Sequence, residues 1–253
     1  MKSLISVMAH SQSNSLNFAF VLLTIITTVI GGTSVMAQEK SPMIWAVQME
    51  QFERRLGDEN ERLSVWNGDA FVGNDDFRVR WLSEGEFDNA SSSFEKLQNQ
   101  FVAQVPISTF FDAKAGLRID TPKGPDRWYA TAGVSGLAPQ WVEIDADIFL
   151  SEDGDLSARL DAEYELLLTN WLILTPSADV EFAFSDDREV GIGSGLSSAE
   201  LGVRLSYDLV ERSISPYVGV VYERKFGSTA SLAQDENEDA EGWLGVLGLK
   251  MVF

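Results

Sequence analysis

Polar and apolar residues alternate along most of the chain with a period of two, the spacing of a β-strand rather than of a helix. The acids of the segments 140–150 and 156–168 fall on one face of an extended strand, and apolar neighbours fall on the other. These acids are Glu143, Asp145 and Asp147, followed by Asp161, Glu163 and Glu165. The pattern repeats at 76–87 with Arg78, Arg80, Glu84 and Glu86, at 113–120 with Arg118, and at 197–209 with Arg204. The chain is therefore predicted to be all-β.

Turn residues divide the alternating region into about twelve strands. We expect them at 44–56, 62–73, 76–87, 94–111, 113–120, 127–137, 140–150, 156–168, 171–185, 197–209, 214–226 and 241–253. Connections at one end are short, and those at the other end are longer, as in antiparallel membrane barrels. Short turns are expected at 74–75, 112, 138–139, 169–170 and 211–213. Ten strands is the alternative, because Pro106 interrupts the region 94–120.

The first 37 residues have the features of a secretory signal peptide. Lys2 provides a positive start, Phe18 to Ile30 form an uncharged apolar run, and Val35-Met36-Ala37 is a small-x-small cleavage site. The apolar run is short for a membrane-spanning helix, so cleavage is favoured over anchoring. Residues 38–43 would then be a short periplasmic lead-in, and residues 44–253 a single β domain.

The last strand indicates which face of the sheet meets lipid. Trp243, Gly245, Leu247, Leu249, Met251 and Phe253 share one face of this strand, and Phe253 is the last residue of the sequence. An apolar face that ends in an aromatic residue, in an exported chain, is typical of an outer-membrane β-barrel. Most Trp and Tyr residues near predicted strand ends, Tyr129 and Tyr217 included, would form interfacial girdles. A soluble periplasmic β-sandwich would show the same alternation with its polar face outward.

Composition excludes several function classes. Without residues 1–37 the chain has 18 Lys+Arg and 39 Asp+Glu, a net charge of −21, which argues against nucleic acid as a partner. The chain has no Cys, and its one His, His10, lies in the signal peptide, so thiolate and imidazole metal sites are not expected. Because barrel hydrolases depend on a His general base, we do not expect an enzyme.

The polar face would line the barrel lumen, and it allows two interpretations. Acids on neighbouring strands, crossed by Arg118, Arg159 and Arg204, would fill the lumen with ion pairs. Unpaired carboxylates would instead form a path or a site for cations. The lumen candidates are Glu143, Asp145, Asp147, Asp161, Glu163, Glu165, Arg118, Arg159 and Arg204.

Soft metal ligands are scarce in the mature chain. Met43 and Met49 lie six residues apart at the start of the first strand and are candidate thioether ligands for Cu(I), although apolar packing also explains them. Met251 should face lipid. The glycine-rich segment 191–195 lacks the Lys-Ser/Thr of a phosphate-binding loop and is interpreted as a flexible external loop.

Three long segments resemble the copper resistance protein B family (CopB or PcoB type). They are GLAPQWVEIDADIFLS at 136–151, RLDAEYELLLTN at 159–170 and YVGVVYERKFG at 217–227, and the likeness extends from about residue 43 to Phe253. The resemblance implies a bacterial outer-membrane barrel that takes part in copper resistance and homeostasis and counts as copper-binding. Many members have Met- and His-rich tracts before the barrel, whereas this chain has only Met43 and Met49 there.

Two functions follow as hypotheses. In the first, the chain is a non-enzymatic outer-membrane protein that binds copper ion or takes part in metal transport by letting copper cross the membrane. A periplasmic copper-handling protein would be its partner. In the second, the lumen is plugged by its charged residues and the barrel is a structural or docking protein without a copper site. Outer-membrane lipid is the expected surrounding in both cases, and nucleic acid is not an expected partner.

Overall fold

Strands form almost wherever the sequence alternates. The computed structural model describes residues 42–57, 62–121, 125–210, 212–235 and 238–253. The predicted signal peptide (residues 1–37) and most of the lead-in (38–43) lie outside the described residues. The strands are β1 (Ile44–Leu56), β2 (Arg62–Gly73), β3 (Arg78–Asp88), β4 (Ser93–Pro106), β5 (Phe111–Thr121), β6 (Arg127–Ala138), β7 (Val142–Ser151), β8 (Leu156–Glu163), β9 (Leu166–Leu167), β10 (Leu172–Ala183), β11 (Gly195–Tyr207), β12 (Ile214–Lys225) and β13 (Glu241–Val252).

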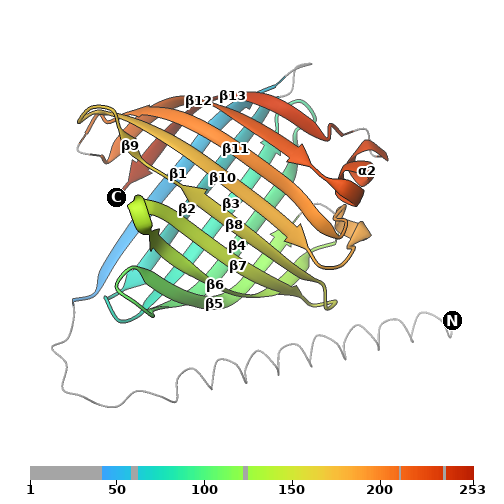
Figure 1. Ribbon diagram of the computed structural model, residues 1–253, viewed down its shortest axis with the longest axis horizontal. Coiled ribbons are helices and arrows are strands. Elements are labelled where there is room, and N and C mark those ends of the chain that lie inside the picture. The colour runs from blue at the N-terminus through green and yellow to red at the C-terminus, as the bar shows by residue number, and fades with distance from the viewer. Residues whose placement is uncertain (1–41, 58–61, 122–124, 211, 236–237) are drawn as a thin grey trace, which may run out of the picture.

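Each strand pairs antiparallel with its neighbours, and the sheet closes on itself through β1 and β13 (Figure 1). The closing register brings Arg55 opposite Val246 and Met49 opposite Met251. The short β9 continues the path of β8 along β10, so the described residues form a barrel of twelve strand positions. The prediction of twelve strands is confirmed, and the region 94–120 divides into β4 and β5, with β4 ending at Pro106.

The break between β8 and β9 was not predicted and has a cause in β10. The pairing of β8 with β10 ends at Glu163 and Ser177, and β9 resumes it where Leu166 lies opposite Leu174. Pro176 lies between these two points and has no backbone N–H to donate, so the hydrogen-bond ladder is interrupted there. The Pro176 carbonyl still accepts a bond from Tyr164 N–H, at 3.1 Å.

The connections have the expected asymmetry in length. At the end of the barrel near β1's start, short turns join β3 to β2, β5 to β4, β10 to β9 and β12 to β11, and the 3-10 helix η3 (Pro139–Trp141) joins β6 to β7. Because outer-membrane barrels have short periplasmic turns and longer extracellular loops, this end is the periplasmic one. The prediction of a turn at Asp112 was wrong. The turn between β4 and β5 occupies residues 107–110, and Asp112 lies inside β5, opposite Pro106.

Two extracellular connections contain helices that the alternation did not predict. The 3-10 helix η4 (Arg188–Val190) lies between β10 and β11, and α2 (Gly227–Asp235) lies between β12 and β13. No helix among the described residues is long and apolar enough to cross a membrane.

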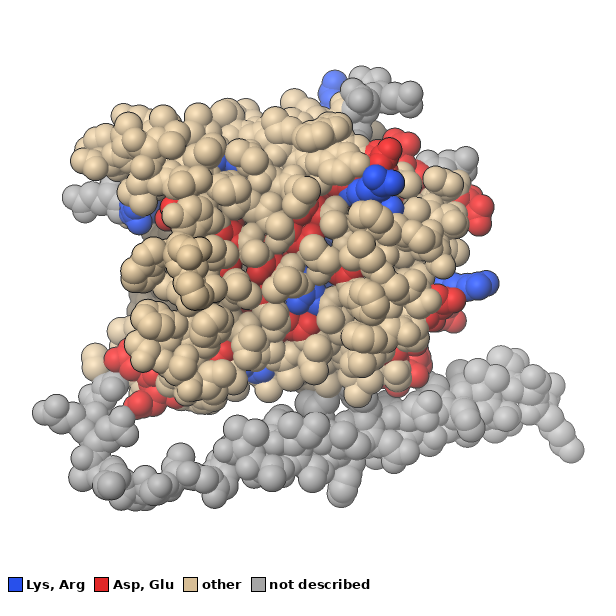
Figure 2. Space-filling view, in the orientation of Figure 1, with Lys and Arg blue, Asp and Glu red and all other residues tan. Residues whose placement is uncertain are grey.

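The outer surface of the barrel is largely uncharged. Figure 2 shows charged residues at the two ends and as a narrow band between uncharged side chains over the central strands. Trp45, Trp141 and Trp171 are exposed at the periplasmic end, and Trp128 and Trp243 near the extracellular end, which agrees with two aromatic girdles. This surface suits lipid contact.

Two aromatic residues predicted for the girdles lie inside the barrel instead. Tyr129 and Tyr217 are buried, and the Tyr217 hydroxyl donates to Glu53 at 2.9 Å. Both residues follow the inward alternation of their strands, which their closeness to strand ends had obscured. Tyr217 also belongs to an apolar cluster inside the wall, with Leu63, Val221, Leu244 and Val246.

Candidate functional site

The lumen collects the charged residues of the inward strand faces. The predicted lumen residues Arg118, Arg159 and Arg204 all form ion pairs there, and so do Asp145, Asp147 and Glu165. Among the described residues, Glu143, Asp161 and Glu163 form no ion pair. The alternation therefore identified the inward face correctly, while no metal ion or ligand tests the role of these residues.

Five acids form a continuous line across the lumen wall. Asp145 on β7 lies opposite Asp161 on β8, Asp161 opposite Asp179 on β10, Asp179 opposite Glu200 on β11, and Glu200 opposite Glu223 on β12. We call these five residues the acid row. Like charges directly opposite each other destabilise a sheet, so the row needs compensating cations or water.

Cations from other strands compensate most of the acid row. Lys114 on β5 binds Asp145, the Arg159 Nε lies 2.5 Å from Asp179, and the Arg55 Nη1 lies 2.9 Å from Glu200 and also contacts Glu223. Asp161, between Asp145 and Asp179 in the row, has no ion-pair partner among the described residues. It is therefore the carboxylate of the row that remains available to a mobile cation.

A buried cluster holds one side of the barrel together. The Glu53 side chain is fully buried and accepts bonds from Arg55 at 2.7 Å and from the Arg204 Nε at 3.1 Å, besides the bond from Tyr217. Residues of three strands (β1, β11 and β12) thus share one carboxylate. Charges removed from water require such complete pairing, because an isolated buried charge is very costly.

A second group of charges crosses the lumen. Arg159 on β8 donates from Nη1 to both carboxylate oxygens of Glu84 on β3, at 2.9 and 2.8 Å. Lys96 on β4 lies 3.3 Å from the same carboxylate. We call the Arg159–Glu84 contact the brace. Since β3 and β8 are five positions apart in the sheet, the brace obstructs the lumen at this level.

Arg118 is held by both charge and aromatic packing. Its guanidinium donates twice to Asp120, at 2.7 and 2.6 Å, and lies 4.3 Å from the ring centroid of Phe149 and 5.1 Å from that of Tyr129. A cation bound in this way is fixed in position, so Arg118 is part of the packed wall.

The methionines do not converge on one place. Met49 lies on the outward face of β1, opposite Met251 and Gly68, and its sulfur lies over Gly68. Met43 is 69 % exposed just before β1. Six residues of extended chain span roughly 20 Å, so these two thioethers do not bind a single ion in one chain. Copper binding by Met43 and Met49 stays a prediction, with each methionine acting separately.

The described part of the lumen contains no preformed metal centre. No group of three or more Asp, Glu, His or Cys among the described residues is arranged to hold a metal ion. Carboxylate oxygens bind Cu(II) better than the soft Cu(I), which prefers sulfur. The donor set therefore fits weak, transient contact with a divalent ion.

The acidic loops are tied into the extracellular end of the barrel. Asp186 accepts a bond from Ser194 N–H at 2.7 Å, which lowers the pKa of this carboxyl. Asp187 and Glu189 bind the buried Arg127, at 3.1 and 3.2 Å, and Asp153 binds it as well. The segment 191–195, interpreted as a flexible loop, packs against α2 through Gly193.

Sequence reasoning missed several lumen residues. Glu84 lay on a predicted polar face but was not chosen as a lumen candidate. Glu53 and Arg55 were missed because an irregular pairing after Met49 shifts the alternation of β1. Asp179, Glu200 and Glu223 could have been found by extending the register from Asp145 and Asp161 across the neighbouring strands.

Comparison with known proteins gives consistent results. Residues 43–253 match the family described as copper resistance protein B precursor. A copper resistance protein B homolog of Pseudomonas syringae pv. tomato is 36 % identical over 189 residues, which cover 75 % of this chain and 63 % of that protein. Copper resistance protein B of Escherichia coli is 33 % identical over 213 residues, 84 % of this chain and 71 % of that protein. The matched region thus spans about two thirds of each relative's length.

Among solved structures, the NanC porin superimposes with a TM-score of 0.50 at 12 % identity, covering 82 % of this chain and 99 % of that chain. This likeness supports the barrel fold.

Proposed function

Because the chain belongs to the copper resistance protein B family, we propose that it lets copper ions cross the bacterial outer membrane along its acidic lumen. Its family and its barrel fold establish the outer-membrane location. Copper would be cargo in this proposal, and no catalytic step is involved.

The acid row is the observation that carries the proposal. The five carboxylates lie at paired positions. Asp161 would be a free oxygen ligand for a moving cation, and the other four would exchange that cation against their Lys and Arg partners. Conduction needs sites that attract an ion but release it again, and a row of single carboxylates meets this requirement better than a closed metal cage. Oxygen donors also favour Cu(II), the ion that oxygen and nitrogen sites bind most strongly among first-row divalent metals.

A periplasmic copper-handling protein would exchange the ion at the end with the short turns. Met43 lies exposed at this end and would provide a soft ligand there. This role for Met43 does not require that Met49 bind the same ion.

The second candidate is a docking or structural barrel with a closed lumen, and the brace favours it. Arg159 and Glu84 obstruct the lumen in the present structure, as an internal plug would. The two candidates differ in one respect: only the first requires the charge of the acid row.

Asp161→Asn tests the proposal, since this substitution removes a carboxyl group without leaving an arginine or lysine unpaired. We expect copper tolerance of cells that carry this variant to fall toward that of cells without the protein. Asp75→Asn, in an exposed periplasmic turn, is the matched control and should keep full tolerance. Full tolerance of Asp161→Asn, with the barrel still folded and heat-modifiable, would favour the docking function.

A further inference from the structure

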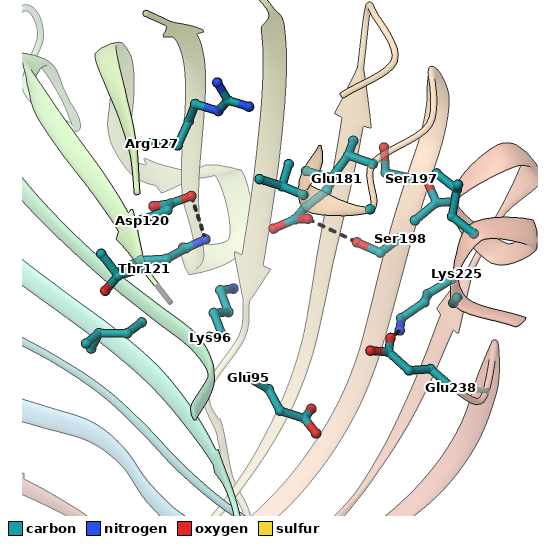
Figure 3. Close-up of a pocket in the computed structure, with 18 of the residues that line it drawn as sticks. Glu95, Lys96, Asp120, Thr121, Arg127, Glu181, Ser197, Ser198, Lys225 and Glu238 are labelled. Carbon is teal, nitrogen blue, oxygen red and sulfur yellow. Dashed lines mark hydrogen bonds and ion pairs between the residues drawn. The ribbon is translucent and has the colours of Figure 1, made fainter. Parts of the chain in front are cut away.

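The extracellular end of the lumen contains a cavity of about 270 Å³, to which α2 contributes one wall (Figure 3). We call this cavity the vestibule; its charged and hydroxyl lining includes Lys96, Asp120, Arg127, Glu181, Ser198 and Lys225. Since a single water molecule needs only about 10–15 Å³ of such space, the vestibule has room for a hydrated metal ion.

The vestibule adjoins the brace. Lys96 lines the vestibule. Its ammonium group also lies 3.3 Å from Glu84, the carboxylate of the brace. Glu181 points toward Ser198, whose hydroxyl donates to it at 3.2 Å, and it forms no ion pair among the described residues (Figure 3). An ion that reaches Glu181 from outside is therefore one step from the charged groups that close the lumen.

α2 is held in place by a small number of specific contacts. The Thr229 hydroxyl accepts a bond from Gly193 N–H at 3.0 Å and donates to the Gly193 carbonyl at 3.3 Å. Thr229 and Ala233 are the buried residues of the helix. A Cβ at position 193 would lie 2.3 Å from the Ser228 Cβ, so only glycine permits this close approach.

The remainder of the helix is weakly attached. Among the described residues, the Ser231 hydroxyl bonds only to the Gly227 carbonyl within α2. Lys225, the last residue of β12, and Glu238, between α2 and β13, form a partly exposed pair at 2.7 Å. An element with few buried contacts opens at lower free energy than the barrel that carries it.

We propose that α2 is a lid over the vestibule, that the Thr229–Gly193 contact holds it closed, and that its release admits small hydrated cations from the extracellular side. The identity of the ion as copper rests on the proposed function. The lid itself depends only on the contacts of α2 and the lining of the vestibule.

The test measures access to the vestibule without copper. Because the chain has no cysteine, Ser198→Cys gives a single thiol inside the vestibule of the full-length, detergent-folded barrel. The rate of its modification by a small cationic methanethiosulfonate reagent is compared in three backgrounds: no further change, Thr229→Val, and the control Ser231→Ala.

Thr229→Val keeps the shape of the side chain and removes both bonds to Gly193. We expect the modification rate to rise about tenfold, the effect on a closed–open equilibrium of one lost buried hydrogen-bonded contact, while Ser231→Ala leaves the rate unchanged. Gly193→Ala is a second way to displace the lid, with Gly242→Ala as its control because a Cβ there meets no atom within 4 Å.

Equal modification rates in all variants would overturn the lid proposal. So would a modification rate in the Ser198→Cys barrel as fast as that of an exposed thiol in Asp75→Cys. If Asp161→Asn kept full copper tolerance while Thr229→Val still raised the labelling rate, the lid would stand and the barrel would admit a cation other than copper. The two proposals are thus tested separately.

Discussion

Arg159 and Glu84 face each other from opposite parts of the barrel wall and are joined by two hydrogen bonds of 2.9 and 2.8 Å. Twelve strands spaced about 4.8 Å apart and tilted about 40° would enclose a circle roughly 24 Å across, which is farther than these two side chains reach together. The barrel is therefore flattened where β3 and β8 approach, and the brace both marks this narrow level and keeps it narrow.

Removing the brace should widen the conducting path. In Glu84→Ala/Arg159→Ala the net charge is unchanged, but the obstruction between β3 and β8 is lost. We expect the single-channel conductance in KCl, measured in planar lipid bilayers, to rise severalfold. The double variant Arg224→Ala/Glu241→Ala removes an exposed pair at 3.4 Å and is the matched control. Identical conductance of the brace variant and the wild type would show that the lumen is closed elsewhere.

The buried Glu53 cluster should contribute strongly to stability. Glu53→Gln leaves Arg55 and Arg204 without their shared carboxylate, and loss of one partner of a buried ion pair costs about 3–5 kcal/mol. Guanidinium unfolding of the barrel in lipid vesicles measures this change in the free energy of unfolding. Arg224→Ala, at an exposed pair, should change it by about 1 kcal/mol or less. A similar small effect of both substitutions would mean that Glu53 is dispensable.

The membrane orientation predicts a contrast between two arginine substitutions. Leu201 lies on the outward face at the centre of β11 and is 54 % exposed, so Leu201→Arg should destabilise the bilayer-embedded barrel by about 2–4 kcal/mol. Gln98→Arg places the same side chain in the lumen near Asp120 and should be tolerated. If Gln98→Arg destabilised the barrel more than Leu201→Arg, the assignment of inner and outer faces would be wrong.

The methionines should not limit passage of Cu(II). Met49 is on the outward face, and Met43 is remote from it, so neither lines the acid row. Met43→Leu/Met49→Leu should keep the wild-type rate of Cu(II) passage while losing any Cu(I) bound in competition with a Cu(I) chelator. Loss of Cu(II) passage in this variant would contradict the lumen route and restore the methionines as its central ligands.

The alternation of the sequence predicted the strands and their two faces well because both follow directly from the period of two, while the signal peptide and the last strand indicated which face meets lipid. Asp145, Asp161 and Arg204 were placed correctly for this reason. The break in β8 was missed because its cause is Pro176 on the neighbouring strand, and the pairing of strands is not visible in a single segment.

The site was less predictable than the fold. Glu53 and Arg55 come after an irregular pairing in β1, which shifts their alternation, and the brace joins residues 75 positions apart. α2 was missed because its sequence has no periodic apolar face, and its position depends on the close approach of Gly193. Such contacts arise from tertiary packing rather than from local pattern.

Uptake of Cu(II) into liposomes that contain the folded barrel and an enclosed copper-sensitive dye tests the central claim most directly. The acid-row account predicts dye quenching with the wild type, a faster response with Glu84→Ala/Arg159→Ala, and a clearly slower response with Asp161→Asn than with Asp75→Asn. No quenching by either the wild type or the brace variant, in liposomes where the barrel is shown to be folded, would contradict copper passage through this lumen.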